Sequence, residues 1–128
     1  MRAIVKINNK QLFGKSIEAL VARELRQQGL KLVSNNYYCR SGEIDLVMFE
    51  PPGQLVFVEV RYRNSSGFGT ALESVEFRKQ QKLKRAAAHF LMRFPSFNRY
   101  PARFDVVAVR PFAGQKLQDI DWIKNAFS

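Results

Sequence analysis

The stretch that most constrains the fold is residues 55–63, which reads Leu-Val-Phe-Val-Glu-Val-Arg-Tyr-Arg. Its β-branched and aromatic residues suit the middle of a β-sheet, where such side chains pack well. A second run of this kind covers 43–50, and a Pro-Pro-Gly turn occupies 51–53 between the two. The sequence therefore predicts a β-hairpin in which Glu59 and Arg61, two residues apart, project from the same face.

Two other segments show helical periodicity. Residues 13–28 carry an apolar stripe that ends at Gly29, and residues 77–94 carry a second stripe. Ahead of the second segment, Thr70-x-x-Glu73 resembles a helix capping box. The stripes consist of Ile17, Leu20, Val21 and Leu25 in the first segment and of Leu83, Ala86, Ala87, Phe90, Leu91 and Phe94 in the second.

The remaining segments complete a single domain over residues 1–128. Strands are predicted at 30–38, where an Asn-Asn pair interrupts the run, and at 103–109. Residues 116–127 supply a last short strand or turn. The order αβββαβ predicts an α/β fold, a mixed β-sheet flanked by helices.

The charge balance indicates a polyanionic partner. The chain has 21 Lys and Arg against 11 Asp and Glu, a net charge of +10. We expect nucleic acid and no membrane, because no amphipathic anchor or long apolar run accompanies the charge. The single Cys39 and single His89 exclude an internal disulfide and a zinc finger. With no signal peptide or membrane span, a cytoplasmic protein is expected.

The hairpin brings acidic residues together. A three-residue loop places Asp45 opposite Glu59 and Glu43 opposite Arg61. Opposed side chains on antiparallel strands have Cβ atoms roughly 4.5–5.5 Å apart, so two carboxylates there repel unless a cation separates them. Hard oxygen ligands suit Mg²⁺ or Mn²⁺. A one-residue change of register would place the acids on opposite faces and remove this argument.

Plain cross-strand ion pairs on a solvated face are the alternative. The same face, however, carries apolar neighbours, which indicate that another element covers it, and buried acids without partners are costly. These neighbours are Val47, Phe49, Leu55 and Phe57.

Two helical residues point toward the same place. Glu18 lies at the margin of the first apolar stripe, and Lys79 continues the core-facing line of the second helix. Each alone is also compatible with a snorkelling or salt-bridging role. Around Lys79 a basic run forms either a solvated face or a surface that contacts phosphates. Its members are Arg78, Lys82, Lys84 and Arg85.

These residues carry a pattern that resembles the PD-(D/E)XK nucleases and, more closely, the YraN-like family. Members of that family look like relatives of archaeal Holliday-junction resolvases within the restriction-endonuclease-like fold. The likeness covers nearly the whole chain. It runs through Gly14-x-x-x-Glu18-x-x-x-Ala22, Gly42-Glu43-Ile44-Asp45-Leu46, Phe57-Val58-Glu59-Val60, Phe68-Gly69, Arg78-Lys79-Gln80, Phe104-Asp105-Val106-Val107 and Asn125-Ala126-Phe127.

The resemblance implies roles for these positions. Asp45 and Glu59 would be the principal ligands of Mg²⁺ or Mn²⁺, and Glu18 would complete the metal site. Arg61 stands where the nuclease pattern has lysine; arginine stays charged and cannot act as a base, but it can stabilise charge on phosphoryl oxygens. Lys79 would supply the missing ammonium. Junction resolution needs two active centres, so the resemblance also implies a homodimer.

Three hypotheses follow. The first is a metal-dependent DNA endonuclease, acting on branched or damaged DNA, with Asp45, Glu59, Arg61 and Lys79 as catalytic residues. The second is a nucleic-acid-binding module that keeps the nuclease fold without turnover, which Arg61 favours. The third is a protein-interaction domain whose charge serves another acidic surface.

Overall fold

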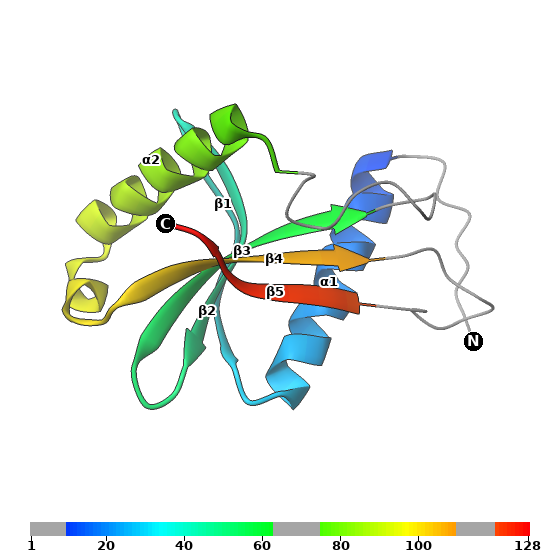
Figure 1. Ribbon diagram of the computed structural model, residues 1–128, viewed down its shortest axis with the longest axis horizontal. Coiled ribbons are helices and arrows are strands. Elements are labelled where there is room, and N and C mark those ends of the chain that lie inside the picture. Colours follow the sequence, from blue (N-terminus) through cyan, green and yellow to red (C-terminus); the bar gives the residue numbers. More distant parts are fainter. Residues whose placement is uncertain (1–9, 63–74, 110–119) are drawn as a thin grey trace.

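The computed structural model describes residues 10–62, 75–109 and 120–128 (Figure 1). The predicted capping box and the loop at 64–69 lie outside these residues. In chain order the elements are α1 (Lys10–Gln27), β1 (Lys31–Cys39), β2 (Gly42–Glu50), β3 (Gln54–Tyr62), α2 (Phe77–Arg93), the short 3₁₀ helix η2 (Pro95–Arg99), β4 (Ala102–Val109) and β5 (Ile120–Phe127). No described helix is both long and apolar enough to cross a membrane.

The five strands form one mixed sheet in the order β1-β2-β3-β4-β5. Tight turns make β1, β2 and β3 an antiparallel meander, whereas β4 pairs parallel to β3 because the chain crosses over through α2. β5 returns antiparallel to β4 along the sheet edge. The mixed α/β fold is therefore confirmed, and the segment predicted as a strand or turn at 116–127 contains the strand β5.

The two helices cover opposite faces of the sheet (Figure 1). Ile17, Val21 and Leu25 of α1 are buried against one face, as their helical spacing predicts. Ala86, Ala87 and Phe90 of α2 are buried against the other face. The sheet is thus the middle layer of three, and side chains from both helices reach it.

Besides a bulge between Leu32 and Ser34 of β1, side-chain alternation reverses at facing positions of β1 and β2. On β2, Leu46 faces α1 but Ile44, two residues away, faces α2. On β1, Asn36 has a positive φ of 50°, a left-handed conformation that Asn tolerates better than most residues. Asn36 and Asp45 stand between the cross-strand pairs Asn35–Leu46 and Tyr37–Ile44. The last turn of the β1–β2 hairpin is consequently rotated relative to the rest of the sheet.

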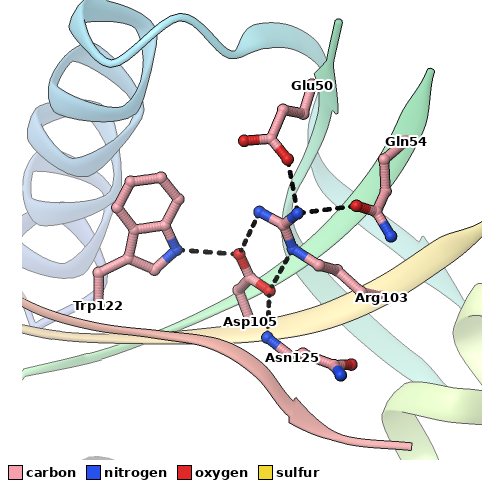
Figure 2. Close-up of polar contacts among 6 residues, drawn as sticks. All are labelled: Glu50, Gln54, Arg103, Asp105, Trp122 and Asn125. Carbon is pink, nitrogen blue, oxygen red and sulfur yellow. Dashed lines mark hydrogen bonds and ion pairs between the residues drawn. The ribbon is translucent and has the colours of Figure 1, made fainter. Parts of the chain in front are cut away.

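A buried polar network fixes β5 and the β2–β3 hairpin to β4 (Figure 2). Asp105 is fully buried and accepts hydrogen bonds from Arg103 Nε at 2.9 Å, Trp122 Nε1 at 2.9 Å and the backbone N–H of Asn125 at 2.9 Å. Arg103 also donates to Glu50 Oε1 at 2.6 Å and to the side-chain oxygen of Gln54 at 2.9 Å. Both charges are therefore paired, as burial requires.

Candidate functional site

The site begins where β2 and β3 separate. The predicted register is correct from Glu50–Gln54 to Leu46–Val58, which is the last pair of this ladder. At Asp45 the strands part, and its Oδ2 accepts the backbone N–H of Val60 at 2.8 Å. The predicted pairing of Glu43 with Arg61 is wrong, because the ladder ends at Leu46–Val58. Since side-chain alternation reverses in β2, the Glu43 carboxylate lies beside Glu18 of α1 instead.

Three carboxylates gather on the α1 side of this break. Oxygens of Glu18, Glu43 and Asp45 all lie within 4.8 Å of one another. Asn36 Nδ2 bridges two of them, donating to Glu18 Oε1 at 2.8 Å and to Glu43 Oε2 at 2.9 Å. The left-handed backbone of Asn36 thus places an amide between acids that come from a helix and a strand.

Glu59 lies on the α2 side of the sheet and is only 4% exposed. Its Oε2 faces two cations, Arg61 Nη1 at 3.2 Å and Lys79 Nζ at 3.8 Å. Its Oε1 is buried and has no hydrogen-bond partner among the described residues. A buried carboxylate oxygen without a donor is costly, and a bound cation is one way to satisfy it.

The pKa values of the acids report first their burial and then their mutual repulsion. Burial, followed by the charge of Asp45, raises the pKa of Glu59 from an ordinary 4.5 to about 7. The same two causes raise the pKa of Glu18 to about 7. Burial also raises the pKa of Asp45, although the Val60 N–H and the charge of Lys79 oppose this. Asp45 is therefore electrostatically linked to the acids on both sides of the sheet.

The structure brings together most of the predicted site. Glu18 and Asp45 meet, but their third partner in the compact cluster is Glu43 and not Glu59. In the sequence prediction, Glu43 had no role as a ligand, and the Asn-Asn pair that contains Asn36 counted only as an interruption of a strand. The signal for Asn36 was its place in an Asn-Asn pair within a strand, since Asn is depleted in strands and accepts positive φ.

The predicted basic face divides into two parts. Arg78, Lys82 and Arg85 are exposed at i, i+4 and i+7 and share one flank of α2. Lys84 lies on another flank, with its Nζ 6.0 Å from the ring centre of Phe127. Lys79 faces the sheet as predicted, through its ion pair with Glu59.

The residues present fit a divalent cation. Three features would be relieved by a bound cation: the carboxylate oxygens within 4.8 Å of one another, the Glu59 Oε1 that no described residue contacts by a hydrogen bond, and the raised pKa values of Glu18 and Glu59. Carboxylate oxygens are the ligands that Mg²⁺ and Mn²⁺ prefer. Asp45 belongs to the cluster, and its charge also raises the pKa of Glu59, so a metal held by the cluster and a metal held next to Glu59 would both have Asp45 as a neighbour.

Fold and site define a mixed α/β protein with a carboxylate-rich centre at a break in its sheet. A family model described as "Uncharacterised protein family UPF0102" matches residues 17–109, and the chain belongs to this family. That membership confirms the YraN-like resemblance seen in the sequence.

Bacterial relatives match over nearly their whole length. The UPF0102 protein of Saccharophagus degradans is 49% identical to this chain, over 90% of this chain and 92% of the relative. The UPF0102 protein of Stutzerimonas stutzeri is 48% identical, over 94% of this chain and 98% of the relative. A solved structure, Pyrococcus furiosus SfsA in complex with Ca²⁺, aligns with 11% identity and a TM-score of 0.38. The alignment covers 92% of this chain and 64% of that one, and it is too loose to bear on activity.

Proposed function

We propose that the chain is a Mg²⁺- or Mn²⁺-dependent nuclease that hydrolyses phosphodiester bonds in DNA. The observation that carries the proposal is the buried Oε1 of Glu59, which has no hydrogen-bond partner in the part of the chain that the structure describes and lies near Asp45 and its acidic neighbours. An unpaired buried oxygen costs the fold free energy, whereas an oxygen that is free of hydrogen bonds is available as a metal ligand.

Asp45 and Glu59 would hold the metal, and Glu18 would support it, with Glu43 now added as a neighbour of both Glu18 and Asp45. The metal would lower the pKa of a bound water and offset charge on the scissile phosphate. The protein's own part is to hold these oxygens at fixed positions, through the Asn36 amide and the Val60 N–H.

Arg61 and Lys79 are the cations placed to neutralise a phosphate. Both contact the same oxygen of Glu59, so each lies at the edge of the acidic centre. Arg61 stays charged at any working pH and stabilises anionic oxygens without accepting a proton. Lys79 approaches from α2, next to the exposed flank of Arg78, Lys82 and Arg85. This flank would contact the DNA backbone irrespective of sequence.

The substrate and assembly form part of the same proposal. A branched or damaged DNA is the expected substrate, and a cytoplasmic homodimer would supply the two active centres that a four-way junction needs. The net charge of +10 supports a nucleic-acid partner.

The test is cleavage of labelled linear, flapped and four-way DNA in Mn²⁺. Wild type is expected to cut at least one substrate, and Asp45→Asn is expected to lose more than about 100-fold in rate, because the residue links both groups of acids. Glu24→Gln removes an acid of α1 that lies outside the carboxylate cluster, and it serves as the matched control. Equal cutting by wild type and Asp45→Asn would refute the assigned centre.

A DNA-binding module without turnover is the second candidate. The 3.2 Å ion pair between Arg61 and Glu59 favours it, since a permanent cation already occupies one oxygen of a predicted ligand. This candidate predicts DNA affinity without cleavage in any metal and no gain from Arg61→Lys. Appearance or acceleration of cutting in Arg61→Lys would exclude it.

A further inference from the structure

An exposed aromatic ring stands beside the acidic centre. Tyr38 of β1 is 58% exposed, although its neighbour Tyr37 is buried against α2. Tyr38 pairs directly with Glu43 across the β1–β2 ladder. Side chains of directly opposed residues lie on the same face, with Cβ atoms roughly 4.5–5.5 Å apart. The ring therefore adjoins a carboxylate of the centre.

The reversal at Asn36 and Asp45 creates this placement. In an uninterrupted strand, Tyr37 would face the same side as Asn35, and Tyr38 would face α2. The left-handed backbone of Asn36 exchanges them, so that Tyr37 packs in the core and Tyr38 stands on the side of the carboxylate cluster. The charge of Glu43 raises the pKa of Tyr38, in agreement with this proximity.

Two cationic residues lie near the same hairpin end. Arg40, in the turn two residues beyond Tyr38, is exposed. On the opposite face, the Cβ of Lys82 lies 3.8 Å from where a Cβ on Gly42 would be, so α2 brings its basic flank to this turn. An exposed ring with cations nearby is the usual composition of a surface for single-stranded nucleic acid.

We propose that Tyr38 stacks on an unpaired nucleobase next to the phosphate held at the acidic centre, so that the substrate contains an unpaired nucleotide at that point. This rests on the proposed nuclease function and specifies its substrate class. Within a duplex both faces of each base are already stacked on neighbours. A ring at this position therefore gains a stacking partner only from a flap, a gap, a mismatch or a strand end.

Binding without cleavage tests the proposal. In EDTA, fluorescence anisotropy compares a gapped duplex with an intact duplex of the same length, using wild type, Tyr38→Ala and Tyr38→Phe. We expect Tyr38→Ala to lose about 10-fold in affinity for the gapped DNA alone, and Tyr38→Phe to retain it. Met92→Ala is the matched control, because Met92 is 78% exposed at the far end of α2. Equal losses on both DNAs, or no loss on either, would overturn the proposal.

Crosslinking gives an independent readout. A 5-bromouracil placed in the gap and irradiated is expected to crosslink to Tyr38, and peptide mapping that finds another residue would contradict the stacking.

The two proposals fail separately. A Tyr38-dependent preference for gapped DNA without metal-dependent cutting removes the nuclease but keeps the stacking. Metal-dependent cutting of gapped DNA that Tyr38→Ala does not change removes the stacking but keeps the nuclease.

Discussion

The Glu59 carboxyl is held where its ionised form costs the fold free energy. It is buried, its Oε1 has no partner among the described residues, and Asp45 adds like charge. Arg61 and Lys79 offset this only in part, because the pKa of Glu59 still rises to about 7. A group of this kind is typical of a functional centre, where stability is given up for binding.

Stability without metal should therefore fall as pH rises. Because the folded pKa of Glu59 is above its unfolded value of 4.5, the folded state holds the extra proton and loses this advantage between about pH 4.5 and 7. We expect Glu59→Gln to exceed wild type in unfolding free energy at about pH 8 by on the order of 2 kcal/mol, and to match it near pH 5. Urea unfolding in EDTA measures both values.

Repeating the unfolding experiment with added Mn²⁺ tests whether Glu59 binds the metal. At about pH 8 the metal should stabilise wild type but not Glu59→Gln, since binding only to the folded state adds to its stability. A wild-type unfolding free energy that does not change with pH would contradict the raised pKa.

At the scale of elements, the sequence predicts where helices and strands begin and end better than it predicts irregularities within a strand. The predicted helix 77–94 is found as α2 (Phe77–Arg93), because its stripe is regular and Pro95 follows it. The Pro-Pro-Gly turn fixed the register of β2 on β3. The reversal at Asn36 was not predictable, because residue type permits a left-handed backbone there but does not require it. Glu43 was predicted opposite Arg61 because a regular strand was assumed, whereas the reversal places it beside Glu18 and Asp45.

β5 depends on the Asp105 network. Asp105→Asn removes the charge that pairs with Arg103 and weakens the acceptor for Trp122 and Asn125 (Figure 2). We expect a loss of about 3 kcal/mol in unfolding free energy, because a buried guanidinium is left without its main partner. Hydrogen exchange of β5 amides should accelerate more than that of β2 amides.

Asp121→Asn is the control for this change, since it removes a carboxylate from β5 outside the network and should alter stability by less than about 0.5 kcal/mol. Equal effects of the two substitutions would show that the network is not what holds the strand.

At the scale of the whole molecule, the basic residues of α2 are divided between the candidate site and β5. Arg78, Lys82 and Arg85 share the flank of α2 that reaches the β1–β2 turn, whereas Lys84 lies near Phe127. The sequence prediction counted all four residues as one face, although helical spacing already turns Lys84 about 100° away from Arg85. The structure adds what that second flank contacts, because β5 lies beside Lys84.

Salt dependence of DNA binding should separate these flanks. Replacing Arg78, Lys82 and Arg85 by Gln is expected to reduce the slope of log affinity against log salt by about 2 to 3, since each phosphate contact on duplex DNA contributes about 0.9. Lys84→Gln should leave the slope nearly unchanged. Affinities measured between about 50 and 200 mM salt provide the slopes. An equal change per residue on both flanks would contradict the division.

The paired reversal in β1 and β2 also limits how the chain can change in length. Deleting Asn36 alone would place Tyr37 directly after Asn35, so ordinary alternation would still turn Tyr37 toward α2, but Asp45 would then face no residue of β1. The deletion would also remove the amide that bridges Glu18 and Glu43. A matching deletion at Asp45 would restore the pairing and remove the central acid. One-residue gaps at these two positions are therefore compatible with the core but not with the carboxylate centre.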